Sequence, residues 1–122
     1  MSNALNWFEI PVVDFERSVA FYGKLLDKTL HIEIFMGISN AFLPFEKGDV
    51  GGSLVCNPQQ QPAQSGTLVY LNVNGTLDAV IRRIEPAGGK IVLPKTSIGP
   101  AGEIATFLDS EGNLVGLHSE VA

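Results

Sequence analysis

The sequence predicts an α+β fold built from two tandem βαβββ modules, because one order of elements occurs twice and a polar linker separates the copies. In each half, a β-rich run precedes a helix with one apolar stripe, and three short β-rich runs follow. The halves are residues 1–56 and 67–122, and the linker "NPQQQPAQSG" occupies residues 57–66. This repeat indicates one α+β domain with two small sheets.

The first half opens with a strand-like run from Leu5 to Val13, and Asp14 follows as a good N-cap for a helix. Four apolar residues then recur at spacings of four, three and four, which places them on one helical face. They are Phe15, Val19, Tyr22 and Leu26. The helix is expected to end near Asp27, and residues 29–37, 39–48 and 49–56 are expected to form three strands.

The second half repeats this order with a strand from Thr67 to Val73, a capping Thr76 and a helix ending at Pro86 and the following glycine pair. The apolar stripe of that helix is Leu77, Ile81 and Ile84. Strands are expected within residues 90–98, 102–109 and 113–120. The last two are joined by the turn "DSEGN", in which Gly112 can take a positive φ.

Composition limits the class of partner and the compartment. The chain has 122 residues, a net charge of −5 and a pI near 4.8, so it lacks the basic surface that nucleic acids and anionic membranes require. Its single cysteine, Cys56, excludes an intramolecular disulfide and fits a reducing compartment. No apolar run approaches the length of a membrane span, so a cytoplasmic protein is expected.

Two segments carry a resemblance to a known family. "WFEIPVVDFERSVAFYGKLL" resembles the strand, cap and helix that open the vicinal oxygen chelate superfamily, and "GEIATFLDSEGNLVGLHS" resembles its closing hairpin. This superfamily includes glyoxalase I, extradiol dioxygenases, methylmalonyl-CoA epimerase, and bleomycin- and fosfomycin-resistance proteins. The resemblance implies an open, barrel-like mixed sheet with helices outside, a central small-molecule cavity and a homodimer.

In metal-dependent members of this superfamily, one His, Glu or Gln from each of four strands holds a divalent ion. Carried over by position, these sites fall on residues whose side chains offer no lone pair to such a cation. They are Trp7, Leu68, Gly116 and, on the fourth strand, Leu54 or Gly52. We therefore expect neither the usual metal site nor another cofactor.

Residues two positions further along each strand share its face, so they are expected to line the same cavity. They are Glu9, Tyr70, His118 and, if Leu54 is the right match, Cys56. Glu9 and His118 are candidates for an acid–base pair; alternatively they are structural, or they hold a metal in a displaced site. Cys56 is a candidate cavity residue or a small core hydrophobe.

Other conspicuous residues have competing interpretations. His31 and Glu33 alternate with apolar neighbours, which favours the solvent side of a strand. Six aromatic residues are mostly core candidates, although some are candidates for the wall of a pocket for a flat or apolar ligand. They are Trp7, Phe35, Phe42, Phe45, Tyr70 and Phe107.

Three functions follow as alternatives. The first is a metal-independent lyase or isomerase in which Glu9 or His118 moves a proton beside a carbonyl. The second is a protein that sequesters a small hydrophobic molecule, as the resemblance to bleomycin-resistance proteins implies. The third is a domain with a vestigial pocket. Metal-dependent chemistry of the lactoylglutathione lyase or dioxygenase type would require the displaced site.

Overall fold

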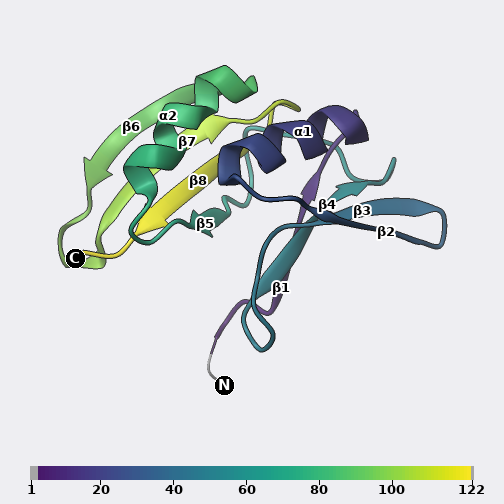
Figure 1. The fold of residues 1–122 in the computed structure, drawn as a ribbon, viewed down its shortest axis with the longest axis horizontal. Helices are drawn as coiled ribbons and strands as arrows, with labels where there is room; N and C mark the ends of the chain where they lie inside the picture. Colours follow the sequence, from purple (N-terminus) through teal and green to yellow (C-terminus); the bar gives the residue numbers. More distant parts are fainter. Residues whose placement is uncertain (1–2, 122) are drawn as a thin grey trace.

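The structure is a computed structural model and describes residues 3–121. Within these residues, eight strands and two α-helices follow in the order that the repeat predicts, and one 3-10 turn is added between β6 and β7 (Figure 1). The first half contains β1 (Trp7–Pro11), α1 (Phe15–Leu26), β2 (His31–Phe35), β3 (Ile38–Phe42) and β4 (Gly51–Cys56). The second contains β5 (Tyr70–Asn72), α2 (Leu77–Ala87), β6 (Lys90–Ser97), η1 (Gly99–Ala101), β7 (Glu103–Leu108) and β8 (Leu114–Ser119).

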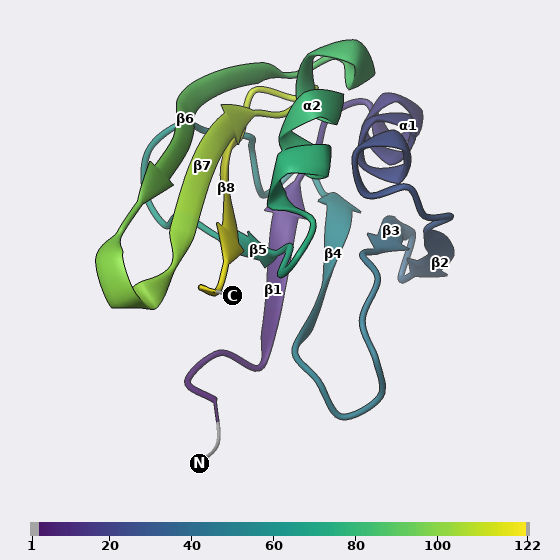
Figure 2. The same ribbon diagram turned by 60° about the vertical axis from the view of Figure 1, so that its left-hand side comes forward.

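The strands form two four-stranded sheets with the same topology, so the predicted α+β fold of two βαβββ modules is confirmed (Figure 2). The strand orders are β1-β4-β3-β2 in the first sheet and β5-β8-β7-β6 in the second. The first strand of each module pairs in parallel with the fourth, and the remaining pairs are antiparallel. In each sheet the first strand of the module therefore lies at an edge.

Several strands are shorter than the sequence predicts. The second module's first strand is expected over Thr67–Val73, but the ladder covers Tyr70–Asn72, because its only strand neighbour within the described residues is β8. The third run is expected over residues 39–48, but β3 ends at Phe42. β5 lies at a sheet edge and pairs on one side alone, so hydrophobic alternation overestimates its length. β3 is an inner strand, and Pro44, which has no amide hydrogen to donate, follows its end by two residues.

Helix α1 begins as predicted and buries a somewhat different face. The Asp14 carboxylate accepts a hydrogen bond of 3.0 Å from the Arg17 amide, and the helix ends at Asp27 in a left-handed conformation. Its most deeply buried residues are Ser18, Phe21, Tyr22 and Leu25. The rest of the predicted stripe is only partly buried, because α1 packs against both β4 and α2.

Thr76 stands before α2 as predicted but does not cap it through its side chain. Its hydroxyl donates instead to the Val73 carbonyl at 3.3 Å. Helix α2 continues through Pro86 to Ala87, and Gly88 ends it at a φ of +115°. In the β7–β8 turn, Gly112 takes the predicted positive φ, at +87°.

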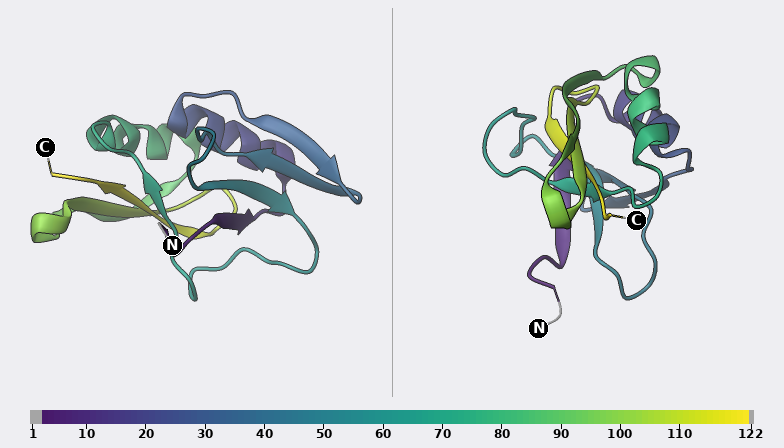
Figure 3. Two further views of the ribbon diagram at one scale, coloured as in Figure 1. Left: turned by 90° about the horizontal axis from the view of Figure 1, so that it is seen from below. Right: turned by 90° about the vertical axis from the view of Figure 1, so that its left-hand side faces the viewer.

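Both halves contribute to one continuous apolar core, with α1 and α2 side by side over it (Figures 1 and 3). Phe21 from the first module meets Phe107 from the second at 6.0 Å between ring centroids. The turn between β7 and β8 binds the first module through polar groups. The Asn113 amide donates to the Pro11 carbonyl at 2.7 Å, and Tyr22 donates to the Asp109 carboxylate at 2.7 Å.

Candidate functional site

The register of the first sheet assigns each side chain to one of two faces. Ile10 lies opposite Leu54, and both belong to the core beneath the helices. Residues that alternate with them lie on the other face, which we call the open face. On it a row crosses all four strands, from Glu9 through Ser53 and Phe42 to His31.

Aromatic side chains gather on the open face. Trp7 meets the rings of Phe42 and Phe45, each with a centroid distance of 5.8 Å and an edge-on geometry. His31 stacks on Phe42 at 5.8 Å and 15° between planes, and Phe35 approaches the same ring at 6.2 Å. We call these five residues the aromatic cluster: Trp7, His31, Phe35, Phe42 and Phe45.

A glycine in β4 makes room for part of this cluster. A Cβ atom at Gly51 would lie 2.7 Å from the ring of Phe45, so the ring occupies the space that any other residue would fill. Phe45 comes from the loop after β3, and Gly51 is opposite Trp7 in the sheet. Because Gly51 has no side chain, the ring of Phe45 can pack next to Trp7.

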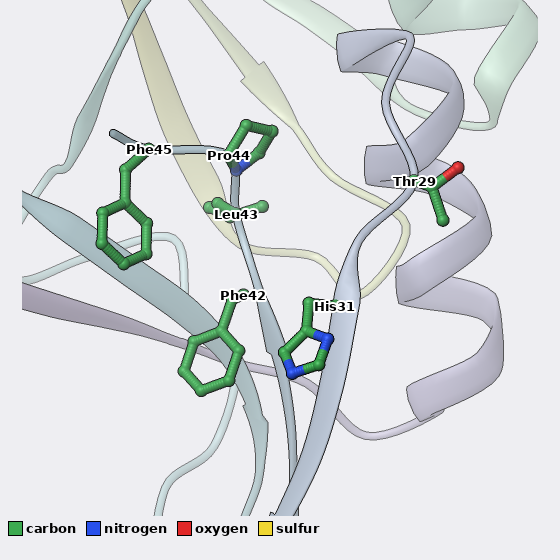
Figure 4. Close-up of a pocket in the computed structure, with 6 residues that line it drawn as sticks. All are labelled: Thr29, His31, Phe42, Leu43, Pro44 and Phe45. Atoms are coloured by element: carbon green, nitrogen blue, oxygen red, sulfur yellow. The ribbon is translucent and has the colours of Figure 1, made fainter. Parts of the chain in front are cut away.

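A pocket of about 310 Å³ opens beside the cluster, where β2 begins and β3 ends. Figure 4 shows the rings of His31 and Phe42 side by side, with the ring of Phe45 beyond Phe42. The pocket is lined by Thr29, His31, Phe42, Leu43, Pro44 and Phe45. Its volume is at the lower end of the range for small-molecule sites, and its lining is mainly apolar.

On β2, His31 of the aromatic cluster is paired with the carboxylate of Glu33. The His31 Nε2 and Glu33 Oε2 atoms lie 2.7 Å apart, and the side chains are 71% and 44% exposed. Sequence alternation correctly places both residues on a solvent-accessible face, but it misses that Phe42 shares this face and stacks on His31. The β2–β3 turn at Met36 and Gly37 sets that pairing, so recognising the turn would have identified the neighbours.

In the second sheet, as in the first, one face carries a histidine and an aromatic ring packed over a glycine. Tyr70 lies opposite Gly116 and its ring covers the glycine so closely that a Cβ atom there would collide with it. His118 lies opposite Asn72, and its Nε2 is 2.6 Å from the Ala101 carbonyl oxygen in η1. Because a carbonyl only accepts, Nε2 carries the hydrogen and donates it.

The predicted site residues therefore divide between two sheets. Trp7 and Glu9 lie on the open face of the first sheet, and Tyr70, Gly116 and His118 share a face of the second. Leu68 precedes β5, two residues before Tyr70, and is half-buried. Within residues 3–121, the hydrogen bond of His118 goes to Ala101, and none joins it to Glu9.

The expected place of Cys56 is wrong. Glu9 is opposite Ser53, so Leu54 and Cys56, which follow the even-numbered alternation, lie on the opposite face of β4. Cys56 packs against the core, and its Sγ is 3.6 Å from the Val13 carbonyl oxygen. The register is shifted by one residue from the assumed match, and a shift of one exchanges the faces of a strand. Gly52 likewise faces the core, beneath the ring of Phe8.

The donor set does not fit the divalent ion of the metal-dependent relatives. Trp7, Gly116 and Leu68 have no suitable donor atom, and the open-face residue nearest to the fourth position is Ser53, whose hydroxyl already donates to Asn40 at 3.1 Å. In the described part of the chain, no three His, Cys, Asp or Glu side chains converge as metal ligands would. We derive no chemistry through a metal.

None of the helices within residues 3–121 is both long enough and apolar enough to cross a membrane.

Charge and hydrogen bonding concentrate at the junction of the modules. There the buried carboxylates of Asp109 and Glu111 accept several hydrogen bonds. These contacts hold the modules together, and they involve none of the residues of the aromatic cluster.

Comparisons with known proteins agree with this fold. A family model described as the Glyoxalase/Bleomycin resistance protein/Dioxygenase superfamily matches residues 4–117. A search of curated proteins found no match. A solved glyoxalase/bleomycin resistance protein/dioxygenase family enzyme from Burkholderia phytofirmans is similar, with a TM-score of 0.71, 13% identity, and coverage of 98% of this chain and 100% of that one.

Two further structures extend the comparison. A fosfomycin resistance protein from Mesorhizobium loti has a TM-score of 0.65 at 15% identity, with coverage of 99% of this chain and 95% of that one. A glyoxalase I variant from Zea mays has a TM-score of 0.67 at 25% identity. There the match covers 93% of this chain and 46% of the maize chain, so this chain corresponds to about half of it.

Proposed function

The chain belongs to the glyoxalase/bleomycin resistance protein/dioxygenase superfamily, and from this premise we propose that it binds a small, largely apolar molecule without a metal ion. The binding surface is the open face of the first sheet with its adjoining pocket. The supporting observation is the aromatic cluster beside a pocket of about 310 Å³, which three of its members line, with Trp7 still 40% exposed. Solvent-accessible rings beside a cavity are typical of sites that stack a flat ligand.

Replacing Phe42 tests this function. Phe42 contacts Trp7, Phe35 and His31, so Phe42→Leu removes the ring at the centre of the cluster while keeping an apolar side chain. We expect at least about tenfold weaker binding of a flat aromatic probe such as naphthalene, measured by quenching of Trp7, the only tryptophan. Phe15→Leu, on α1, is the matched control and should bind as the wild type does. Equal affinity in Phe42→Leu would contradict the proposal.

We further propose that a second copy of the chain completes the cavity. β1 and β5 lie at sheet edges, and large apolar side chains on and near the first sheet are exposed. They include Trp7, Ile34, Phe35, Met36 and Phe45. A twofold dimer that places β1 beside the partner's β5 would pair both edges and cover part of this surface.

The dimer should be seen directly by size exclusion with light scattering at micromolar concentration. The expected mass is twice the chain mass of 13.1 kDa. A mass of one chain that persists across a concentration series would contradict the proposed assembly and leave the pocket beside Phe42 as a site within a single chain.

Acid–base chemistry by Glu9 and His118 is the second candidate function. The observation in its favour is the bond from His118 Nε2 to Ala101, which leaves Nδ1 as the nitrogen able to accept a proton. Within one chain the two residues belong to separate sheets, so this function requires the proposed dimer. Solvent deuterium incorporation beside the carbonyl of a 2-oxo acid or a thioester, lost in His118→Ala, would support it.

This proposal keeps the expected cytoplasmic location, on the ground of the single free cysteine. It does not use Cys56 in binding, because that side chain packs on the helix-covered face.

A further inference from the structure

The strands of the first sheet carry two acidic side chains and neither lysine nor arginine. β1 contains Glu9 and β2 contains Glu33, and none of β1 to β4 contains lysine or arginine. Both carboxylates lie on the open face, Glu9 beside Ser53 and Glu33 two residues after His31. The open face therefore carries a carboxylate on each of its two outer strands, and Phe42 lies on β3 between those strands.

The aromatic cluster also leaves ring surface available to a ligand. Phe35 and Phe45 are 51% and 46% exposed, and Trp7 is 40% exposed. In the edge-on contacts of Trp7 with Phe42 and Phe45, the edge of one ring meets the face of the other, so neither pair is stacked face to face. His31 and Phe42 already form a stack of two flat rings, which a third flat ring could extend.

We propose that the open face selects a flat aromatic molecule that carries a positive charge, an inference that rests on the proposed binding function and specifies its ligand class. A cation over the face of tryptophan or phenylalanine is attracted by the negative charge of the ring face. Glu9 and Glu33 add a long-range attraction that a neutral ligand does not gain. The same two carboxylates repel an anionic ligand, and none of the strands of this sheet carries a lysine or arginine to offset that repulsion.

Glu33 is paired with His31, at 2.7 Å between Oε2 and Nε2. The carboxylate orients the imidazole, and the imidazole ring remains stacked on Phe42.

Three flat probes of similar shape and different charge test the selection at about pH 8 and low ionic strength. N-methylacridinium is a cation, acridine is neutral under these conditions, and anthracene-9-carboxylate is an anion. Binding is followed by quenching of Trp7 and, independently, by isothermal titration calorimetry. We expect the cation to bind about tenfold more tightly than acridine and the anion to bind most weakly.

Variants separate charge from stacking. Glu9→Gln and Glu33→Gln should each weaken the binding of N-methylacridinium by about two- to fivefold and leave the affinity for acridine unchanged. The expected effect is small because both carboxylates are solvent-exposed. Glu85→Gln removes an exposed charge from α2 and is the matched control, with no expected change for either probe. Phe42→Leu should weaken the binding of both N-methylacridinium and acridine.

The possible outcomes distinguish this inference from the proposed function. If acridine binds as tightly as the cation, and Phe42→Leu weakens both, the binding function stands and the charge selection is wrong. If none of the three probes binds, both the function and the inference are contradicted. Tighter binding of the anion would also overturn the inference, since it would mean that Glu9 and Glu33 do not set the preferred charge of the ligand.

Discussion

Replacing Glu111 with glutamine is expected to lower the free energy of unfolding by about 2–4 kcal/mol. The Glu111 side chain has no solvent-accessible surface and joins the two modules. Its Oε1 accepts from the amides of Val13 and Asp14 at 2.9 and 2.7 Å, and its Oε2 accepts from Arg17 Nε at 2.7 Å. In Glu111→Gln one of these donors faces an NH₂ group and loses its acceptor.

The pH dependence gives this prediction a second measurement. Burial would raise the pKa of Glu111, but hydrogen bonds from Arg17 and from the Asp14 and Val13 amides outweigh it, and the net shift is downward. A lowered pKa in the folded state contributes stability above the unfolded-state pKa, and this contribution is lost as the pH falls through the folded value. The difference between wild type and Glu111→Gln in urea denaturation should therefore shrink in acid.

Glu85→Gln is the matched control, because Glu85 is exposed on α2. Its unfolding curve should coincide with that of the wild type. Equal stability of Glu111→Gln and Glu85→Gln at neutral pH would show that the carboxylate at the N-terminus of α1 does not join the modules.

Replacing Asp109 with alanine is expected to lower the free energy of unfolding by about 3–5 kcal/mol. Asp109 is 5% exposed, and its Oδ1 accepts from the amides of Glu111 and Asn113 at 2.8 and 2.9 Å. Its Oδ2 accepts from the Tyr22 hydroxyl and from Asn113 Nδ2 at 2.7 and 3.1 Å. Alanine would leave the Tyr22 hydroxyl and the amides of Glu111 and Asn113 without this acceptor, and Asn113 Nδ2 would keep only its hydrogen bond to the Pro11 carbonyl.

Tyr22 shows how strongly this site is shielded from water. Burial first, and then the charge of Asp109 and its hydrogen bond, raise the pKa of Tyr22 well above its ordinary value. The hydroxyl thus remains a donor in alkaline solution that would ionise an exposed tyrosine. Tyr22→Phe should destabilise the protein less than Asp109→Ala, because it removes one of the hydrogen bonds that Asp109 accepts.

Asp49→Ala is the control for Asp109→Ala, since Asp49 is exposed in the loop between β3 and β4. We expect no measurable change in its urea midpoint. If the two variants unfold at the same urea concentration, the β7–β8 turn does not stabilise the junction in the way its hydrogen bonds imply.

The order of elements was predictable because the repeat constrains it twice. Periodicity identifies both helices, and the side chain and position of Asp14 identify it as an N-cap. The exact buried face of α1 is harder to predict from the sequence, because the other module contributes to the burial of Phe21 and Leu25. A single helix pattern does not report a second packing partner.

The site was predictable only in part. Alternation placed Trp7 and Glu9 on one face, but the face of Cys56 depended on a register between β1 and β4 that sequence spacing does not determine. The pocket depends on antiparallel pairing of β2 with β3, which brings His31 to Phe42 across the turn. Phe45 enters from a loop, where no periodicity identifies a partner.

The most direct test of the central claim is a ¹H–¹⁵N and aromatic ¹H–¹³C NMR titration of the chelator-treated protein with N-methylacridinium. The claim predicts that the largest shift changes occur at Trp7, His31, Phe42 and Phe45, with no metal added. Changes confined to the second sheet around Tyr70 and His118, or binding that appears only after a divalent metal is restored, would contradict it.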